Sequence, residues 1–62
     1  MILSPLAATL DRALREHPRW GEELPSWIAD ALWAEAYTDG KPTREEVSGA
    51  LEELARQRRR AA

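Results

Sequence analysis

The chain has 62 residues and a formal net charge of −2, and it contains three tryptophans, one tyrosine and no cysteine. A chain of this length forms a single domain and buries only ~60% of the surface that it exposes when unfolded. The lack of cysteine excludes disulfide bonds and thiolate metal sites, and it agrees with a reducing compartment. We therefore expect one domain, residues 1–62, in a cytoplasmic protein.

The N-terminal segment MILSPLAATL has no basic residue ahead of its apolar residues, and it contains Pro5. A signal peptide would begin with a basic region, and a membrane span would need ~20 apolar residues in succession. We expect neither here, and we expect no association with a membrane.

The charges are unevenly distributed along the chain. Residues 1–19 carry a net charge of +1, and residues 20–54 combine nine acidic with two basic side chains for a net charge of −7. Residues 55–62 carry +4. The sequence therefore predicts an acidic body followed by a basic tail, residues 55–62.

Ser4 and Pro5 mark the start of the first predicted helix. The serine hydroxyl can accept a free backbone N–H, and proline is well tolerated at the first helical position. Pro18 disfavours helical geometry at His17, so we place this helix at about 5–17. The segment RWGEELP that follows contains a glycine and a second proline, which predicts an irregular connection or a single turn.

The second helix is predicted at about 25–38. Asp39-Gly40 is expected to close it, because glycine adopts the left-handed conformation of a C-terminal cap without strain. The third helix, at about 44–60, follows the motif TREE, in which Thr43 and Glu46 can bond to each other's backbone N–H in a capping box. No segment shows a strand pattern or a repeat. The sequence therefore predicts an all-α fold, a small three-helix bundle.

The second helix is apolar on almost every side. Its expected core face consists of Ile28, Ala29, Leu32, Trp33, Ala36 and Tyr37. Trp27, Ala31 and Ala34 form a second apolar strip on another side. Two interpretations remain open. Either Trp27 folds against Trp20 and Leu24 of the preceding turn, or the strip contacts another polypeptide, with a large anchor beside small residues.

The connection EAYTDGKPTREE can be aligned with a calcium-binding loop that begins at Glu35 and ends at Glu46. Tyr37 stands where an oxygen ligand is required, however, and the capping box explains Glu46 better. The single histidine, His17, has no cysteine to share a zinc ion with, so we interpret it as a residue of the helix end. We predict no metal site and no cofactor.

No hydroxyl of the chain stands at a recognisable spacing from a base that could activate it. A monomer of this size also has little room for a ligand pocket of ~300 Å³. We therefore predict that the protein is not an enzyme.

The segment ARQRRR holds the candidates for contact with nucleic acid, because clustered guanidinium groups neutralise phosphates. They are Arg56, Arg58, Arg59 and Arg60. Cations in a last turn also complement the helix dipole, and the third helix turns acidic side chains outward, which would repel phosphate. A nucleic-acid-binding regulator is therefore the alternative function and the less favoured one.

The leading prediction is a small accessory or regulatory protein that binds another protein, as a homodimer or as the inhibitor of a basic, nucleic-acid-binding partner. Acidic side chains would steer it onto such a partner, and Trp27 would anchor the contact. The predicted interface residues are Trp27, Ala31, Ala34, Glu45, Glu52 and Glu53.

Overall fold

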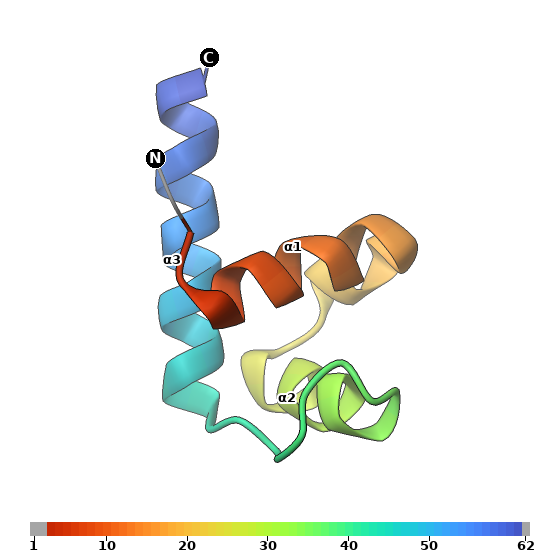
Figure 1. Cartoon of the computed structure of the whole chain (residues 1–62). Helices are drawn as coiled ribbons and strands as arrows, with labels where there is room; N and C mark the ends of the chain where they lie inside the picture. The colour runs from red at the N-terminus through yellow and green to blue at the C-terminus, as the bar shows by residue number, and fades with distance from the viewer. Residues whose placement is uncertain (1–2, 62) are drawn as a thin grey trace.

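Figure 1 shows a computed structural model of the chain, which describes residues 3–61, with Ala61 described by its backbone only. Residues 1, 2 and 62 of the predicted domain and tail lie outside this range. The elements in chain order are α1 (Pro5–Glu16), the 3-10 helix η1 (Pro18–Glu22), α2 (Pro25–Ala34) and α3 (Arg44–Ala61). Residues 3–61 contain no strand, so the predicted all-α three-helix bundle is confirmed.

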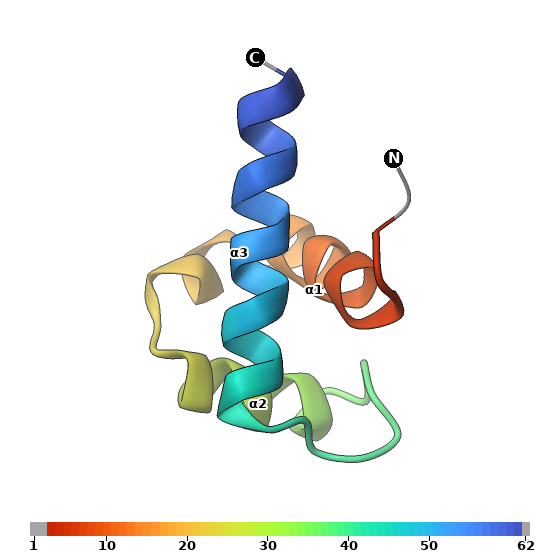
Figure 2. The same cartoon turned by 90° about the vertical axis from the view of Figure 1, so that its left-hand side faces the viewer.

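Helix α3 is the long axis of the molecule. α1 crosses it near its middle, and α2 packs closer to its N-terminal end (Figure 1). The last turns of α3 extend past both of the other helices (Figure 2). Within residues 3–61, no helix combines the length and the apolar character that crossing a membrane requires.

Helix α1 begins as its sequence predicts. The backbone N–H of Ala7 donates to Ser4 Oγ at 3.3 Å, and Pro5 occupies the first helical position. The helix ends at Glu16, one residue before the predicted end, because His17 has left the helical region with φ −132° and ψ 75°. The clash between a proline ring and the residue before it accounts for that conformation.

Helix α2 is shorter than predicted: it ends at Ala34, and the prediction of a helix to Thr38 closed by Gly40 is wrong. The left-handed residue is Ala36, with φ 62°, and no glycine in the described range has a positive φ. The N–H of Tyr37 donates to the carbonyl of Leu32 at 2.8 Å, and the N–H of Ala36 donates to the carbonyl of Trp33 at 3.1 Å. These two bonds form a Schellman motif with alanine at the position that usually holds glycine.

Helix α3 opens with the predicted capping box. Thr43 Oγ1 accepts the N–H of Glu46 at 3.0 Å, and Glu46 Oε1 accepts the N–H of Thr43 at 2.9 Å. Acidic side chains occupy the first turn and arginines the last, which suits the helix dipole at both ends. The helix continues to Ala61, one residue beyond the predicted end.

The core lies where the three helices meet. Its buried residues are Ala7, Leu10, Ala13, Ile28, Ala29, Leu32, Val47, Ala50 and Leu54. Of the core face predicted for α2, Ile28, Ala29 and Leu32 are buried, and Tyr37 packs against the cluster. The prediction that Trp33 belongs to the core is wrong, because 54% of its surface is exposed.

Candidate functional site

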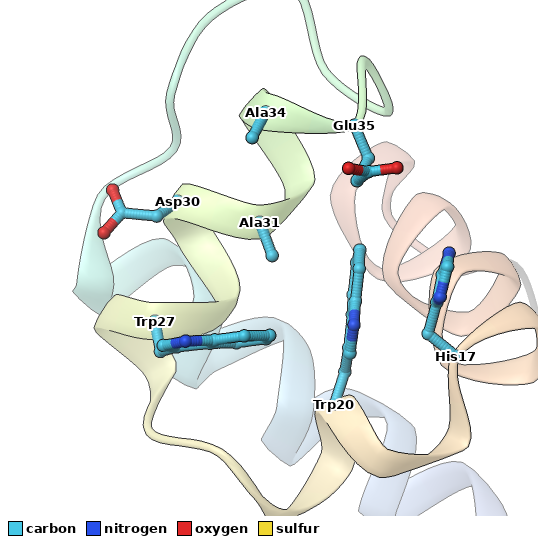
Figure 3. Close-up of a pocket in the computed structure, with 7 residues that line it drawn as sticks. All are labelled: His17, Trp20, Trp27, Asp30, Ala31, Ala34 and Glu35. Carbon is cyan, nitrogen blue, oxygen red and sulfur yellow. The ribbon is translucent and has the colours of Figure 1, made fainter.

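A surface groove of about 510 Å³ lies between η1 and α2. Its walls are formed by His17, Trp20, Trp27, Asp30, Ala31, Ala34 and Glu35. Figure 3 shows Trp20 standing upright between His17 on one side and α2 on the other. The groove therefore joins the end of α1, the 3-10 helix and the outer side of α2.

An aromatic cluster forms the wall of this groove. The His17 ring is stacked on Trp20, with ring centroids 4.2 Å apart and planes 7° from parallel. Trp27 meets Trp20 edge to face, with centroids 5.8 Å apart and planes 79° apart. Offset and edge-to-face pairs of this kind stabilise beyond the area that they bury. The ring of Trp20 is thus held in place from two sides.

Tyr37 connects the aromatic cluster to helix α1. Its ring meets Trp20 edge to face at 5.9 Å, and the Arg12 guanidinium lies 5.4 Å above the tyrosine ring. The Tyr37 hydroxyl donates a hydrogen bond to the carboxylate of Glu16. This bond, more than the accompanying desolvation, raises the pKa of Tyr37 above its usual value. The turn that ends α2 at Ala34 is what carries Tyr37 to α1.

Trp27 makes the contact with Trp20 that the intramolecular interpretation predicts, and its role at an interface stays a prediction. Its ring packs on Trp20, as an intramolecular role requires, yet 43% of its surface remains exposed. Leu24, which was expected to cover it as well, is 72% exposed. A large apolar side chain that is fixed in position but half accessible is the arrangement found at interface anchors.

Ala31 and Ala34 line the groove together with Trp27, as the predicted strip requires. Figure 3 shows the Ala31 methyl group directed toward the corner between the two indole rings. Because both residues are small, a partner's side chain can approach the backbone of α2 closely. Trp33 takes no part in the lining of this groove.

Two carboxylates border the groove, and they differ in surroundings. Asp30 forms an ion pair with Lys41, and its side chain points away from the indole corner (Figure 3). Glu35 lies beyond the edge of the Trp20 ring on the groove side (Figure 3). Its carboxylate forms no hydrogen bond or ion pair with any other residue of the described range.

The acidic residues predicted for the interface do not join this groove. Glu45 and Glu52 are exposed on α3, and Glu45 pairs with Arg44 at 3.2 Å. Glu53 holds the start of α1: its carboxylate accepts the N–H of Ser4 at 2.7 Å and the Ser4 hydroxyl at 2.9 Å. These bonds lower the pKa of Glu53, with the backbone donor as the larger cause. The structure therefore gives Glu53 a role within the chain.

The arginines of the tail are exposed on the projecting turns of α3. Arg56, Arg58, Arg59 and Arg60 all lie there, away from the groove of their own chain. These arginines therefore lie at the end of α3, separate from the aromatic groove.

The structure offers little for metal or covalent chemistry. No group of three histidine, aspartate or glutamate side chains that could hold a metal ion occurs in residues 3–61. Glu46, the last residue of the calcium-loop alignment, caps α3. The groove is lined by no hydroxyl or thiol that could act as a nucleophile.

Sequence reasoning found one side of the groove and missed the other. Trp27, Ala31 and Ala34 were identified from helical periodicity, whereas the stacking of His17 on Trp20 was not. The signal that could have indicated it is the spacing H-P-x-W, since a proline after His17 starts a 3-10 turn, and such a turn brings residues three apart together.

The chain matches no protein-family model, no curated protein and no solved structure.

Proposed function

We propose that the protein is a non-enzymatic accessory or regulatory protein that acts in the cytoplasm by binding another protein, and that the groove between η1 and α2 is its binding site. The observation that supports this most is Trp27. It is held against Trp20, is 43% exposed, and borders a groove of about 510 Å³ floored by alanines. Aromatic anchors of this kind dominate the binding energy of protein interfaces.

The partner is proposed to be basic. Residues 20–54 carry a net charge of −7, and the groove itself is bordered by Asp30 and Glu35. Negative potential of this extent accelerates encounters with positively charged proteins and discourages anionic ones. The lack of cysteine agrees with a reducing cytoplasm.

The experiment is co-purification of the full tagged chain from its native cells, followed by mass spectrometry, for the wild type and two variants. Trp27→Ala should lose the partner, because it removes the anchor of the groove. Trp33→Ala is the matched control, since Trp33 is also exposed but does not line the groove. Circular dichroism should show the same helical content for all three proteins. A partner retained equally by both variants would contradict the proposal.

A second candidate function is nucleic-acid binding through the end of α3. It is favoured by the exposure of Arg56, Arg58, Arg59 and Arg60 on turns that extend beyond the body (Figure 2). Binding to a nonspecific duplex should then weaken steeply with salt, and replacing the four arginines by glutamine should abolish it. An affinity that does not change with salt would exclude this candidate.

A further inference from the structure

We infer that the groove is a receptor site for a guanidinium group, and that the arginine-rich end of α3 of a second copy of the chain supplies it. This inference rests on the proposed function, because it uses the same groove. It adds the chemistry of the ligand and the identity of one occupant.

The two indole rings provide the aromatic part of the site. Trp20 and Trp27 meet at 79° with centroids 5.8 Å apart, so their faces form the two walls of a corner. His17 covers one face of Trp20, and the other face meets the edge of Trp27 and borders the groove beside that contact (Figure 3). Tryptophan is the aromatic residue that attracts cations most strongly, and a planar guanidinium stacks on such a face better than an ammonium group.

Glu35 provides the charge. Its carboxylate lies beyond the edge of the Trp20 ring (Figure 3). It forms no hydrogen bond or ion pair with another residue of the described range, and its charge contributes to the raised pKa of Tyr37. An occupant without positive charge would remove this carboxylate from water and leave it unpaired, which is costly, and an anion would be repelled. A guanidinium packed against the exposed part of the indole pair could donate hydrogen bonds to a carboxylate at the edge of that pair. The lining therefore selects arginine over apolar side chains and over anions.

The chain itself contains a segment with this chemistry. Residues 56–60 carry four arginines, and all four are exposed on the projecting turns of α3. The acidic body and this basic segment have opposite charges, with −7 on residues 20–54 and +4 on residues 55–62. Charge complementarity of this kind favours contact between the body of one molecule and the tail of another.

The arginine-rich end of α3 cannot reach the groove of its own chain. α3 is continuous from Arg44 to Ala61, and its last turns point away from α2, which packs nearer the other end of α3 (Figure 1). To reach the groove of the same chain, the helix would have to break. The occupant must therefore come from a second copy, and two copies that exchange tails would close into a symmetric pair.

The decisive experiment uses two full-length variants and analytical ultracentrifugation. The groove variant carries Trp27→Ala and Glu35→Gln, and the tail variant carries glutamine in place of Arg56, Arg58, Arg59 and Arg60. The wild type should self-associate with rising concentration. Each variant alone loses both groove–tail contacts of the pair and should associate about a hundredfold or more weakly, at about tenfold for each charge-assisted contact, whereas a mixed pair keeps one contact. Mixing the two variants should restore a 1:1 complex, because one supplies an intact tail and the other an intact groove.

Glu35→Gln alone and Glu52→Gln form the matched pair of controls. Both remove one exposed negative charge, but Glu52 lies on α3 and does not line the groove. Self-association should weaken with Glu35→Gln and stay unchanged with Glu52→Gln. A wild type that sediments as a monomer at every concentration would overturn the inference. So would self-association that neither the groove variant nor the tail variant weakens, or a mixture of the two that fails to associate.

A titration with a hexa-arginine peptide, followed by tryptophan fluorescence, separates this inference from the proposed function. If the wild type is monomeric yet binds the peptide, and Glu35→Gln does not bind it, the second copy is excluded and a separate basic partner remains. If a monomeric wild type does not bind the peptide either, both the inference and the basic partner of the proposed function are contradicted.

Discussion

Helices α2 and α3 differ in how their ends are capped. α3 has a capping box at its start, acidic residues in its first turn and arginines in its last. α2 (Pro25–Ala34) has Leu24 at its N-cap with no side-chain hydrogen bond, and the turn after it places Ala36 in the left-handed conformation. Trp27 and Trp33 of this helix are exposed. α3 is thus stabilised largely by its own sequence, whereas α2 depends on contacts with α3 and with the aromatic cluster. The helix with the weaker local signals is the one that borders the groove.

The largest expected effect is a difference in stability between substitutions on the buried and the exposed face of α2. Leu32→Ala should lower the free energy of unfolding by ~2–5 kcal/mol, because Leu32 is fully buried in the core. Trp33→Ala should cost far less, about 1 kcal/mol or below, because more than half of its surface is already exposed. Urea unfolding followed by circular dichroism measures both. Equal losses would mean that Trp33 is packed in solution.

Changes at the two N-caps should act in opposite directions. Thr43→Ala should destabilise the protein by ~1 kcal/mol, because it removes the acceptor for the N–H of Glu46. Leu24→Ser should stabilise it by a similar amount, about 1 kcal/mol. Leu24 is 72% exposed and already has the extended backbone of an N-cap, with φ −68° and ψ 150°. Thermal melts of both variants test the comparison, and a loss of stability in Leu24→Ser would show that its side chain is needed.

Two exchanges of alanine and glycine should each add ~0.5–1 kcal/mol. Ala36→Gly relieves the left-handed conformation that ends α2. Gly49→Ala stiffens the interior of α3, where an added Cβ would meet no atom within 4 Å. The midpoint of urea unfolding measures the gain in stability of each variant. If Ala36→Gly proved destabilising, the turn after α2 would not have the described geometry.

The smallest effects should appear at the extremes of pH. The folded-state pKa of Glu53 is lowered from 4.5, so its stabilising bond to Ser4 is complete above that value and is lost as the pH falls through the lower folded-state pKa. The folded-state pKa of Tyr37 is raised from 10.0, so its bond to Glu16 is complete below that value and is lost as the pH rises through the higher one. Unfolding measured against pH should therefore show a weaker acid dependence in Glu53→Gln and a weaker alkaline dependence in Tyr37→Phe. Profiles that match the wild type would contradict these assignments.

Local sequence signals determined the fold class and most of the helix boundaries. Ser4 with Pro5, Pro18, Pro25 and the TREE motif each act through neighbouring residues, by accepting a backbone N–H or by restricting a backbone angle. Such effects require no knowledge of distant segments. The starts of all three helices were therefore predicted correctly, and so was the buried stripe of Ile28, Ala29 and Leu32.

The candidate site was only half determined in this way. Helical periodicity placed Trp27, Ala31 and Ala34 together, because residues three and four apart share a face. It could not show that Trp20 and His17 would form the opposite wall, since that depends on how η1 folds back toward α2. Nor could it show that Glu53 would bond to Ser4, 49 residues away.

The end of α2 was decided by the tertiary structure. The sequence offers Gly40 as the obvious cap, and a helix to Thr38 would satisfy local preferences. The chain turns at Ala36 instead and accepts a left-handed alanine, because the turn brings Tyr37 to Trp20, Arg12 and Glu16 of the preceding elements. Contacts with three side chains outweigh the strain at one residue. That same turn holds Tyr37 against Trp20, one of the rings that line the groove.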